Sequence, residues 1–286
     1  MGKDLDQFYT NPTVVKHVLG LVNADSYDLI IEPSAGAGDF VNKLPRDKVI
    51  AIDLEPAAAN IKQQNFFSFS PEKKEVSSSV LTIGNPPFGK NSSTAVKFFN
   101  HAATFSDCIA FIVPRTFRKP SVINRLDLNF HLVKQEILKL DSFYVPSGES
   151  YSVPTVFQVW KRQKVKREKL LVLTTCEDFD FISIRKGADK KPTSLHKKEQ
   201  CAAADFCIRR VGVYAGSIFY DFKEKERDWK SHYYIKERTE NVCQILESLN
   251  WNYHESPKFD TAGNPSISKN ELIRFYLNAK EEKNDE

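Results

Sequence analysis

The sequence lacks the features that would place it in a membrane or outside a cell. It has no uninterrupted apolar run approaching the roughly 18 residues of a membrane span. Its first residues, MGKDLDQFYT, contain no apolar stretch typical of a secretory signal. Its five cysteines never form a CxxC pair, which argues against a disulfide framework or a structural zinc site. We therefore expect an intracellular protein, cytoplasmic or nuclear, with reduced thiols, no metal and no membrane partner.

An excess of charge of one sign is also missing. The 286 residues carry 41 Lys and Arg against 37 Asp and Glu, a formal net charge of +4. This balance permits a polyanionic partner without requiring one, so the distribution of charge matters more than its total. The hydrophobic content of 41% is that of a globular chain, long enough for one large core or for a core with a smaller module.

Short apolar runs alternate with helical patterns over the first 160 residues. Asn11 followed by Pro12 predicts a helix start, with apolar residues at helical spacing as far as Val22, and a second helix is expected over 94–103. This alternation predicts an α/β domain with a doubly wound, mostly parallel sheet. The predicted strands end in the apolar runs 30–31, 49–52, 80–83, 109–113 and 156–159.

The basic run 161–169 ends this rhythm. Strand-like stretches follow at 170–173, 181–184, 206–208 and 233–235, and helical patterns at 241–249 and 268–278. We therefore expect a catalytic domain over 1–163 and a smaller α+β module over 164–286.

A glycine-rich turn follows the first strand. In the segment EPSAGAGDF, Gly36 and Gly38 allow positive φ and close approach of a ligand, and we expect a helix to follow. The next strand ends in Asp53, whose carboxylate can accept both ribose hydroxyls of a nucleoside. Glu32 and Asp39 give the turn a negative charge, which suits a ligand with an ammonium and a sulfonium better than a diphosphate.

The tetrapeptide Asn85-Pro86-Pro87-Phe88 follows the third apolar run, at the sheet edge where ligands bind in doubly wound folds. An exocyclic aromatic amine is a poor nucleophile because its lone pair is conjugated with the ring. Acceptors at the Asn85 side chain and the rigidly held Pro86 carbonyl can draw the nitrogen toward tetrahedral geometry. Phe88 offers a face on which a base can stack. A simple tight turn is the alternative interpretation.

The segments DQFYT, EPSAGAGDF and NPPF, in this order, resemble the gamma class of DNA adenine-N6 methyltransferases over roughly residues 4–160. The resemblance implies a class I, Rossmann-like methyltransferase fold with S-adenosyl-L-methionine as cofactor. It implies contacts to the methionine part of the cofactor by Tyr9 and Thr10. It also implies a cofactor turn at Glu32, Ala35 and Gly36, a ribose contact at Asp53, and target-base contacts at Asn85, Pro86, Pro87 and Phe88.

The chain departs from the family's pattern at two places. Where the family has Asp before an aromatic residue that contacts the cofactor adenine, this chain has Asn65 and Phe66. The Asn65 amide can still hydrogen-bond the adenine and Phe66 can stack on it. The family's second wall of the target pocket is assigned to Tyr151, with Phe143 and Tyr144 interpreted as core.

An adenine in a duplex must be extruded, or presented in a single strand, before its amine can react. We expect the target-recognition region in the C-terminal module, with nucleic-acid contacts at Lys164, Lys166 and Arg167. A solvated linker is the alternative for that run. A hairpin over 209–216 would present Arg209 and Arg210. Lysines 186, 190, 191, 197 and 198 would add positive charge.

Several alternatives remain at the sequence level. DNA is favoured over RNA by the EPSAGAGDF turn and the C-terminal module, although small ribosomal-RNA and mRNA-cap adenine methyltransferases carry similar motifs. Protein-glutamine methyltransferases share the NPP[YF] turn, but they carry a helical domain for which the residues ahead of Glu32 leave little room. Cytosine-N4 methylation uses the same chemistry, and a catalytically inactive binding subunit is a further possibility. The oligomeric state stays open, with a monomer allowed.

Overall fold

The computed structural model describes residues 8–72, 79–145, 147–182, 203–223, 227–228, 230–261 and 263–284. The chain forms two compact units, Met1–Leu170 and Leu171–Glu286. None of the helices in these described ranges is long and apolar enough to span a bilayer. The boundary falls later than the predicted 163/164 because Arg167 is hydrogen-bonded into the first unit, to the carbonyls of Phe130, Ile123 and Leu126.

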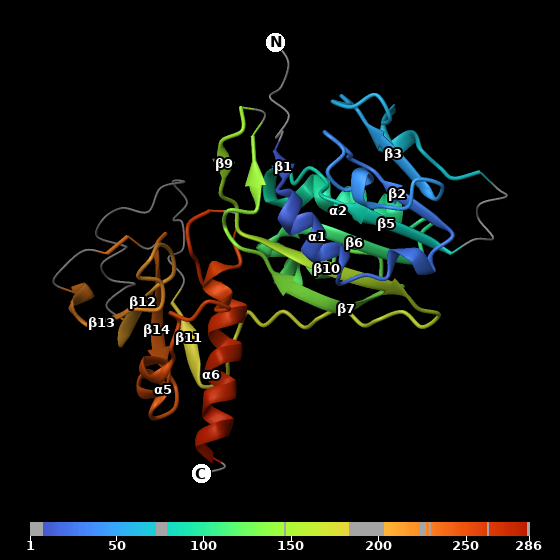
Figure 1. The fold of residues 1–286 in the computed structure, drawn as a ribbon. Helices are drawn as coiled ribbons and strands as arrows, with labels where there is room; N and C mark the ends of the chain where they lie inside the picture. The colour runs from blue at the N-terminus through green and yellow to red at the C-terminus, as the bar shows by residue number, and fades with distance from the viewer. Residues whose placement is uncertain are drawn as a thin grey trace, which may run out of the picture. The chain divides into compact units, whose positions relative to one another are not determined.

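Unit 1 is built on a seven-stranded sheet of order β4-β3-β2-β5-β6-β10-β7 (Figure 1). The five strands β4-β3-β2-β5-β6 are each parallel to their neighbours, whereas β10 runs antiparallel between β6 and β7. The predicted fold class, a doubly wound and mostly parallel sheet, is confirmed. The strands are β2 (Leu29–Glu32), β3 (Val49–Asp53), β4 (Lys62–Gln63), β5 (Val80–Gly84), β6 (Cys108–Pro114), β7 (Phe130–Ile137) and β10 (Thr155–Arg162).

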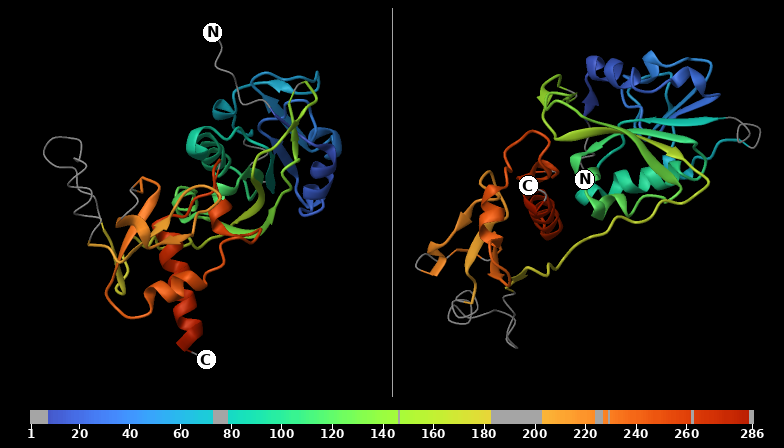
Figure 2. Two further views of the ribbon diagram at one scale, coloured as in Figure 1. Left: turned by 90° about the vertical axis from the view of Figure 1, so that its left-hand side faces the viewer. Right: turned by 90° about the horizontal axis from the view of Figure 1, so that it is seen from below.

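The two faces of the sheet bury separate cores, as the two-residue period of a strand requires. In β2, Leu29 and Ile31 join one cluster while Ile30 joins the other. Helix α2 (Ser93–Ala102) packs on the first face and α1 (Pro12–Leu19) on the second. The right-hand view of Figure 2 shows these helices on opposite sides of the strands.

Local sequence signals set the ends of the predicted helices. The Asn11 side chain accepts from the backbone N–H of Thr13, and Pro12 occupies the first helical position of α1, as predicted. Helix α2 also lies where it was expected. A short helix, α3 (Pro120–Ile123), follows β6.

The prediction of an α-helix after the glycine turn is wrong. Only one 3₁₀ turn, η2 (Val41–Lys43), lies between β2 and β3. Pro45 forces the preceding Leu44 into an extended conformation, with ψ of 156°, so no α-helix can continue through it. Further 3₁₀ turns among the described residues of unit 1 are η1 (Ala24–Ser26), η3 (Phe66–Ser68), η4 (Lys90–Ser92) and η5 (Arg115–Arg118).

A small antiparallel sheet, β1-β8-β9, joins segments far apart in the sequence. It consists of β1 (Tyr9–Thr10), β8 (Phe143–Tyr144) and β9 (Ser150–Tyr151). Tyr9 pairs with Tyr144, and Phe143 pairs with Tyr151. The sheet therefore brings the N-terminal motif beside the loop that precedes β10.

Unit 2 has a four-stranded antiparallel sheet of order β11-β14-β12-β13. Its predicted α+β character is confirmed, and both expected helices form. The expected strand at 170–173 is wrong, because this stretch has no neighbouring strand and its side chains Leu170, Leu171 and Val172 are exposed. The elements are β11 (Phe179–Phe181), β12 (Phe206–Arg209), β13 (Ile218–Phe219), η6 (Asp221–Lys223), β14 (His232–Glu237), α5 (Val242–Ser248), η7 (Pro257–Phe259) and α6 (Lys269–Asn284).

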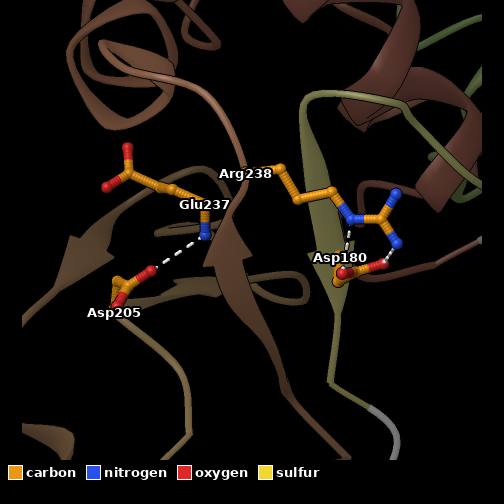
Figure 3. A network of polar contacts seen from close by, with 4 residues as sticks. All are labelled: Asp180, Asp205, Glu237 and Arg238. Carbon is orange, nitrogen blue, oxygen red and sulfur yellow. Dashed lines mark hydrogen bonds and ion pairs between the residues drawn. The ribbon is translucent and has the colours of Figure 1, made fainter.

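Carboxylates fix the end of β14 against both of its neighbours (Figure 3). The Arg238 guanidinium donates to both oxygens of Asp180 on β11, at 2.7 and 2.8 Å. The Glu237 backbone N–H donates to Asp205, next to β12, at 2.9 Å. These contacts hold the end of β14 in register with the two strands on either side of it.

Candidate functional site

A cavity of about 630 Å³ opens beyond the carboxyl ends of β2, β3 and β5 in unit 1. Its volume is in the range of small-molecule sites. Ligands in open α/β sheets bind at this edge. The lining includes the sequence-predicted residues Tyr9, Thr10, Glu32, Ala35, Gly36, Asp53, Asn65, Phe66, Asn85, Pro86 and Pro87. The structure thus gathers the predicted cofactor residues and most of the NPPF turn around one cavity.

Asp53 holds the glycine turn in shape. Its Oδ2 accepts from the backbone N–H of Gly36, and its Oδ1 from that of Glu55, each at 2.8 Å. Each carboxylate oxygen keeps a further lone pair for a ligand hydroxyl. Gly36 has a positive φ of 50°, and a Cβ there would lie 2.9 Å from Cε1 of Tyr9. The Tyr9 ring therefore packs directly on the turn, which explains why the position needs glycine.

Glu32 is a buried acid with unused hydrogen-bonding capacity. Burial raises the pKa of its carboxyl well above the ordinary value, and the nearby charges of Asp39 and Asp53 raise it further, while the Val41 backbone N–H lowers it. Its Oε2 has no hydrogen-bond partner among the described residues. A cationic ligand group in the cavity would compensate this carboxylate, so the donor set fits an ammonium or a sulfonium.

Tyr144, predicted as core, hydrogen-bonds Asp39, a residue of the cavity wall. Its hydroxyl donates to Asp39, 3.0 Å from Oδ2 and 3.2 Å from Oδ1. Burial and the Asp39 carboxylate raise the pKa of Tyr144 to about 12. Burial raises the pKa of Asp39, although this hydrogen bond opposes the shift. Phe143 is buried, as predicted.

The NPPF turn brings Asn85 to the wall of the cavity. The Asn85 carbonyl accepts from Ser34 Oγ at 3.0 Å, which ties the turn to the glycine loop. The Asn85 side-chain Oδ1 is buried and has no hydrogen-bond partner within the described part of the chain. Gly89 has a positive φ of 67°, and a Cβ there would collide with the Thr94 side chain, so only glycine fits there. A buried acceptor without a partner is costly, so the turn leaves a hydrogen-bonding requirement beside the cavity.

Phe88 does not face the cavity as expected. It is 8% exposed and does not line the cavity, because the ring of Phe8 lies against it with centroids 5.1 Å apart. The same Phe8 ring stacks on Tyr151, at 5.3 Å and 29°, and contacts Phe143 edge-on at 5.3 Å. The structure therefore brings Phe88 and Tyr151 to one aromatic cluster through Phe8, a residue that the sequence analysis did not single out.

Asn65 and Phe66 lie at the cavity, but both side chains are already engaged. Asn65 Oδ1 accepts from the backbone N–H of Phe67 at 2.9 Å and caps η3. Phe66 is 2% exposed and stacks on Phe98, with centroids 5.0 Å apart. Leu54 and Phe67 are exposed and line the same cavity, and neither was predicted. Adjacency in the sequence could have identified them, because Leu54 directly follows Asp53 and Phe67 directly follows Phe66.

Lys90 is a further cavity residue that sequence reasoning missed. It is exposed and comes two residues after Phe88, at the start of η4. The next residues, Asn91 and Ser92, both have positive φ, 53° and 59°, which costs on the order of 1–3 kcal/mol each. Ser92 Oγ bonds Thr116 Oγ1 at 2.6 Å, which helps to hold this strained turn.

The cationic side chains of the basic run 161–169 differ in exposure and in contacts. The side chains of Lys164 and Lys166 are exposed. The Arg167 guanidinium instead donates to backbone carbonyls, with Nη2 at 2.7 Å from Ile123 O and Nε at 3.0 Å from Phe130 O. Its burial lowers the pKa of the guanidinium. The expected nucleic-acid contact at Arg167 is therefore replaced by a structural one, because the donors already satisfy carbonyls of unit 1.

The predicted hairpin of unit 2 is present between β12 and β13. Arg209 donates to Val211 O at 3.0 Å and lies 5.9 Å from the Tyr214 ring centroid. Arg210 lies 5.2 Å from the ring centroid of Tyr233. Both arginines are half-buried on aromatic faces. The lysines expected to add charge at 186, 190, 191, 197 and 198 lie outside the described residues.

No family model matches the chain. It is 27% identical over 179 residues to Protein ENHANCED DOWNY MILDEW 2 of Arabidopsis thaliana, covering 54% of this chain and 14% of that protein. The chain thus spans about one seventh of the length of this relative.

The chain is also similar to solved structures at low sequence identity. It matches 23S rRNA methyltransferase ErmE with a TM-score of 0.41 and 10% identity, covering 96% of this chain and 100% of that one. It matches magnesium protoporphyrin IX methyltransferase of Synechocystis PCC 6803, solved with bound SAM, with 0.37 and 12%, covering 53% and 77%. A protein from Vibrio vulnificus, provisionally named a type I restriction modification subunit, matches with 0.44 and 14%, covering 94% and 60%.

Proposed function

We propose that this protein is an S-adenosyl-L-methionine-dependent methyltransferase that transfers a methyl group to N6 of adenine in a nucleic acid. One observation carries the proposal. The buried Asn85 Oδ1, without a partner in the described residues, and the equally unpartnered Glu32 Oε2 belong to residues that line the same cavity. The first suits an amine donor and the second a cation, and this reaction needs both.

The residues around the cavity fit the cofactor. S-adenosyl-L-methionine supplies an electrophilic methyl group on a positively charged sulfur. The Asp53 carboxylate would accept the ribose hydroxyls with the lone pairs that its two backbone donors leave free. A bound cation would favour the ionised forms of Glu32 and Asp39, whose pKa values burial raises, and these would then supply the opposite charge. Tyr9 and Thr10 would close over the methionine part. Leu54, Phe67 and Phe98 provide apolar surface for the adenine ring, beside Asn65 and Phe66.

Asn85 and Pro86 would orient the target amine. The Asn85 amide oxygen accepts one amino hydrogen and the Pro86 carbonyl the other, which draws the nitrogen lone pair out of conjugation with the base. Proline fixes φ, so its carbonyl is held without reorganisation. A titratable base is not required for this step, because the acceleration comes from orientation and electrostatic placement.

A nucleic-acid substrate fits the exposed cations. Lys90 stands at the cavity, directly after the NPPF turn, where a phosphate next to the target nucleotide would pass. Lys164 and Lys166 would add contacts to the backbone. In unit 2, the proposed recognition module, Arg209 and Arg210 would contact phosphate or base edges. DNA is the favoured polymer and RNA the alternative.

The proposal is tested by supplying the protein with radiolabelled cofactor and, separately, duplex DNA, single-stranded DNA and total RNA. Mass spectrometry of the digested polymer identifies the modified nucleoside. N6-methyladenosine or its deoxy form supports the proposal and names the polymer. Label on N4 of cytosine, or on none of the three polymers, contradicts it.

A further inference from the structure

The ring of Phe8 contacts both Phe88 and Tyr151, the two residues proposed above to hold the target base. Stacking on Phe88 requires access to its ring, yet Phe88 is 8% exposed and Phe8 lies against it at 5.1 Å and 62°. Phe8 also stacks on Tyr151, at 5.3 Å. Phe88 and Tyr151, both described, make no direct ring contact with each other, so the two are connected through the Phe8 ring.

The short strand β1 explains this position of Phe8. Tyr9 pairs with Tyr144 and Thr10 with Phe143, so the backbone beside Phe8 is hydrogen-bonded to the segment that leads to Tyr151. Successive side chains of a strand point to opposite faces. Tyr9 accordingly packs on Gly36 at the cofactor turn, while Phe8 packs into the aromatic cluster. Tyr9 thus contacts the glycine turn, and the adjacent Phe8 contacts Phe88 of the NPPF turn.

We propose that Phe8 is a plug of the target slot, displaced when the extruded adenine enters between Phe88 and Tyr151. This inference rests on the proposed function. Ring pairs favour centroid distances of about 4.5–7 Å, so Phe8 already takes the place of a stacking partner for both walls. Entry of a base exchanges these ring contacts for base contacts. A group that stacks poorly cannot compensate for the lost ring contacts of Phe8. Phe8 therefore selects for groups that stack well, as well as covering the slot.

The test measures entry of a base without requiring turnover. A single-stranded oligonucleotide with one 2-aminopurine at the target position is titrated with full-length protein in the presence of S-adenosylhomocysteine, and its fluorescence gives a Kd. Phe8→Ala removes the competing ring, so its Kd should be about fivefold to tenfold lower than wild type, the scale of one or two aromatic contacts. Phe8→Leu should fall in between, and Phe8→Trp should bind more weakly than wild type.

Leu140→Ala is the matched control, because Leu140 is an exposed apolar residue of the same unit, and its Kd should not change. Thermal unfolding checks that each variant folds, and Phe8→Trp keeps the test available should Phe8→Ala unfold. An unchanged or higher Kd for Phe8→Ala, or tighter binding by Phe8→Trp, overturns the plug while leaving the proposed reaction intact. Binding without any 2-aminopurine response in wild type and Phe8→Ala alike contradicts both the plug and the proposed function.

Discussion

The Tyr144 hydroxyl donates to the Asp39 carboxylate at 3.0 Å, across 105 positions of sequence. Tyr144 belongs to β8, which pairs with the strand carrying Tyr9, and the two rings lie 5.5 Å apart. Asp39 belongs to the loop that follows the glycine turn. This hydrogen bond therefore connects the small sheet β1-β8-β9, which carries Tyr9, to the loop that follows the glycine turn.

Tyr144→Phe should weaken cofactor binding without abolishing it. Loss of a hydrogen bond to a charged group lowers the free energy of unfolding by about 1–2 kcal/mol, and loosening of the Tyr9 cover should raise the cofactor Kd by about threefold to tenfold. Tyr220→Phe is the control, since it removes a hydroxyl that bonds Glu247 in unit 2. Calorimetric titration with S-adenosylhomocysteine compares the variants. Equal affinities for wild type and Tyr144→Phe would contradict this role.

Asp53→Asn should reduce cofactor affinity by about tenfold or more, because an amide replaces one acceptor oxygen by a donor beside the backbone N–H groups and the ribose. Asp25→Asn, an exposed acid of the same unit, should leave the Kd unchanged. Titration of both variants with S-adenosylhomocysteine decides the point. A wild-type Kd for Asp53→Asn would move the ribose contact elsewhere.

Glu32 should make the stability of the ligand-free protein depend on pH. Its folded-state pKa is raised, so the native state holds a proton that the unfolded chain releases in the ordinary carboxyl range. Stability is therefore greatest at low pH with respect to this group and falls as pH rises through the raised pKa. Glu32→Gln should flatten the dependence in thermal unfolding scans across pH.

Binding of a cation favours the charged form of Glu32, so cofactor binding should release a proton in wild type and less in Glu32→Gln. Calorimetry in buffers of different ionisation enthalpy measures this release. Identical pH profiles and identical proton release in both proteins would show that Glu32 does not serve the ligand.

The double variant Lys164→Glu/Lys166→Glu should lower nucleic-acid affinity and reduce its dependence on salt, by up to about two in the slope for duplex DNA. Both side chains are exposed, so folding should be unaffected. Arg167→Ala should behave in the opposite way. Loss of its carbonyl contacts should lower the free energy of unfolding by roughly 2 kcal/mol, with little effect on the salt slope. An unchanged affinity of the double variant would make the run a plain linker.

The glycine turn, the Asp53 strand end and the NPPF turn could be predicted because their signals are local. Each is an apolar strand followed by residues that only a tight turn accommodates, and parallel strands bring their carboxyl ends to one edge. Helices α1 and α2 were predictable for the same reason, since each has an apolar stripe within a single segment and α1 also has a capping residue, Asn11.

The features that were missed depend on contacts between distant segments. Strand β7 reads as mixed polar and apolar sequence because it is the edge of the sheet, with Leu132 and Val133 exposed. Phe8 contacts Phe88 and Tyr151 only because β1 pairs with β8. Arg167 reads as one more cation in a basic run, and only the fold shows which carbonyls its guanidinium satisfies.

The Asn85 side-chain oxygen is proposed to orient the reacting amine, and the rate of methyl transfer within a single turnover measures this role. With cofactor and target in excess over their Kd values, Asn85→Ala should transfer methyl at least about 10²-fold more slowly than wild type. Its affinity for S-adenosylhomocysteine should stay within about twofold, since the cofactor contacts are made by other residues. A single-turnover rate close to wild type would contradict the claim that the Asn85 oxygen orients the reacting amine.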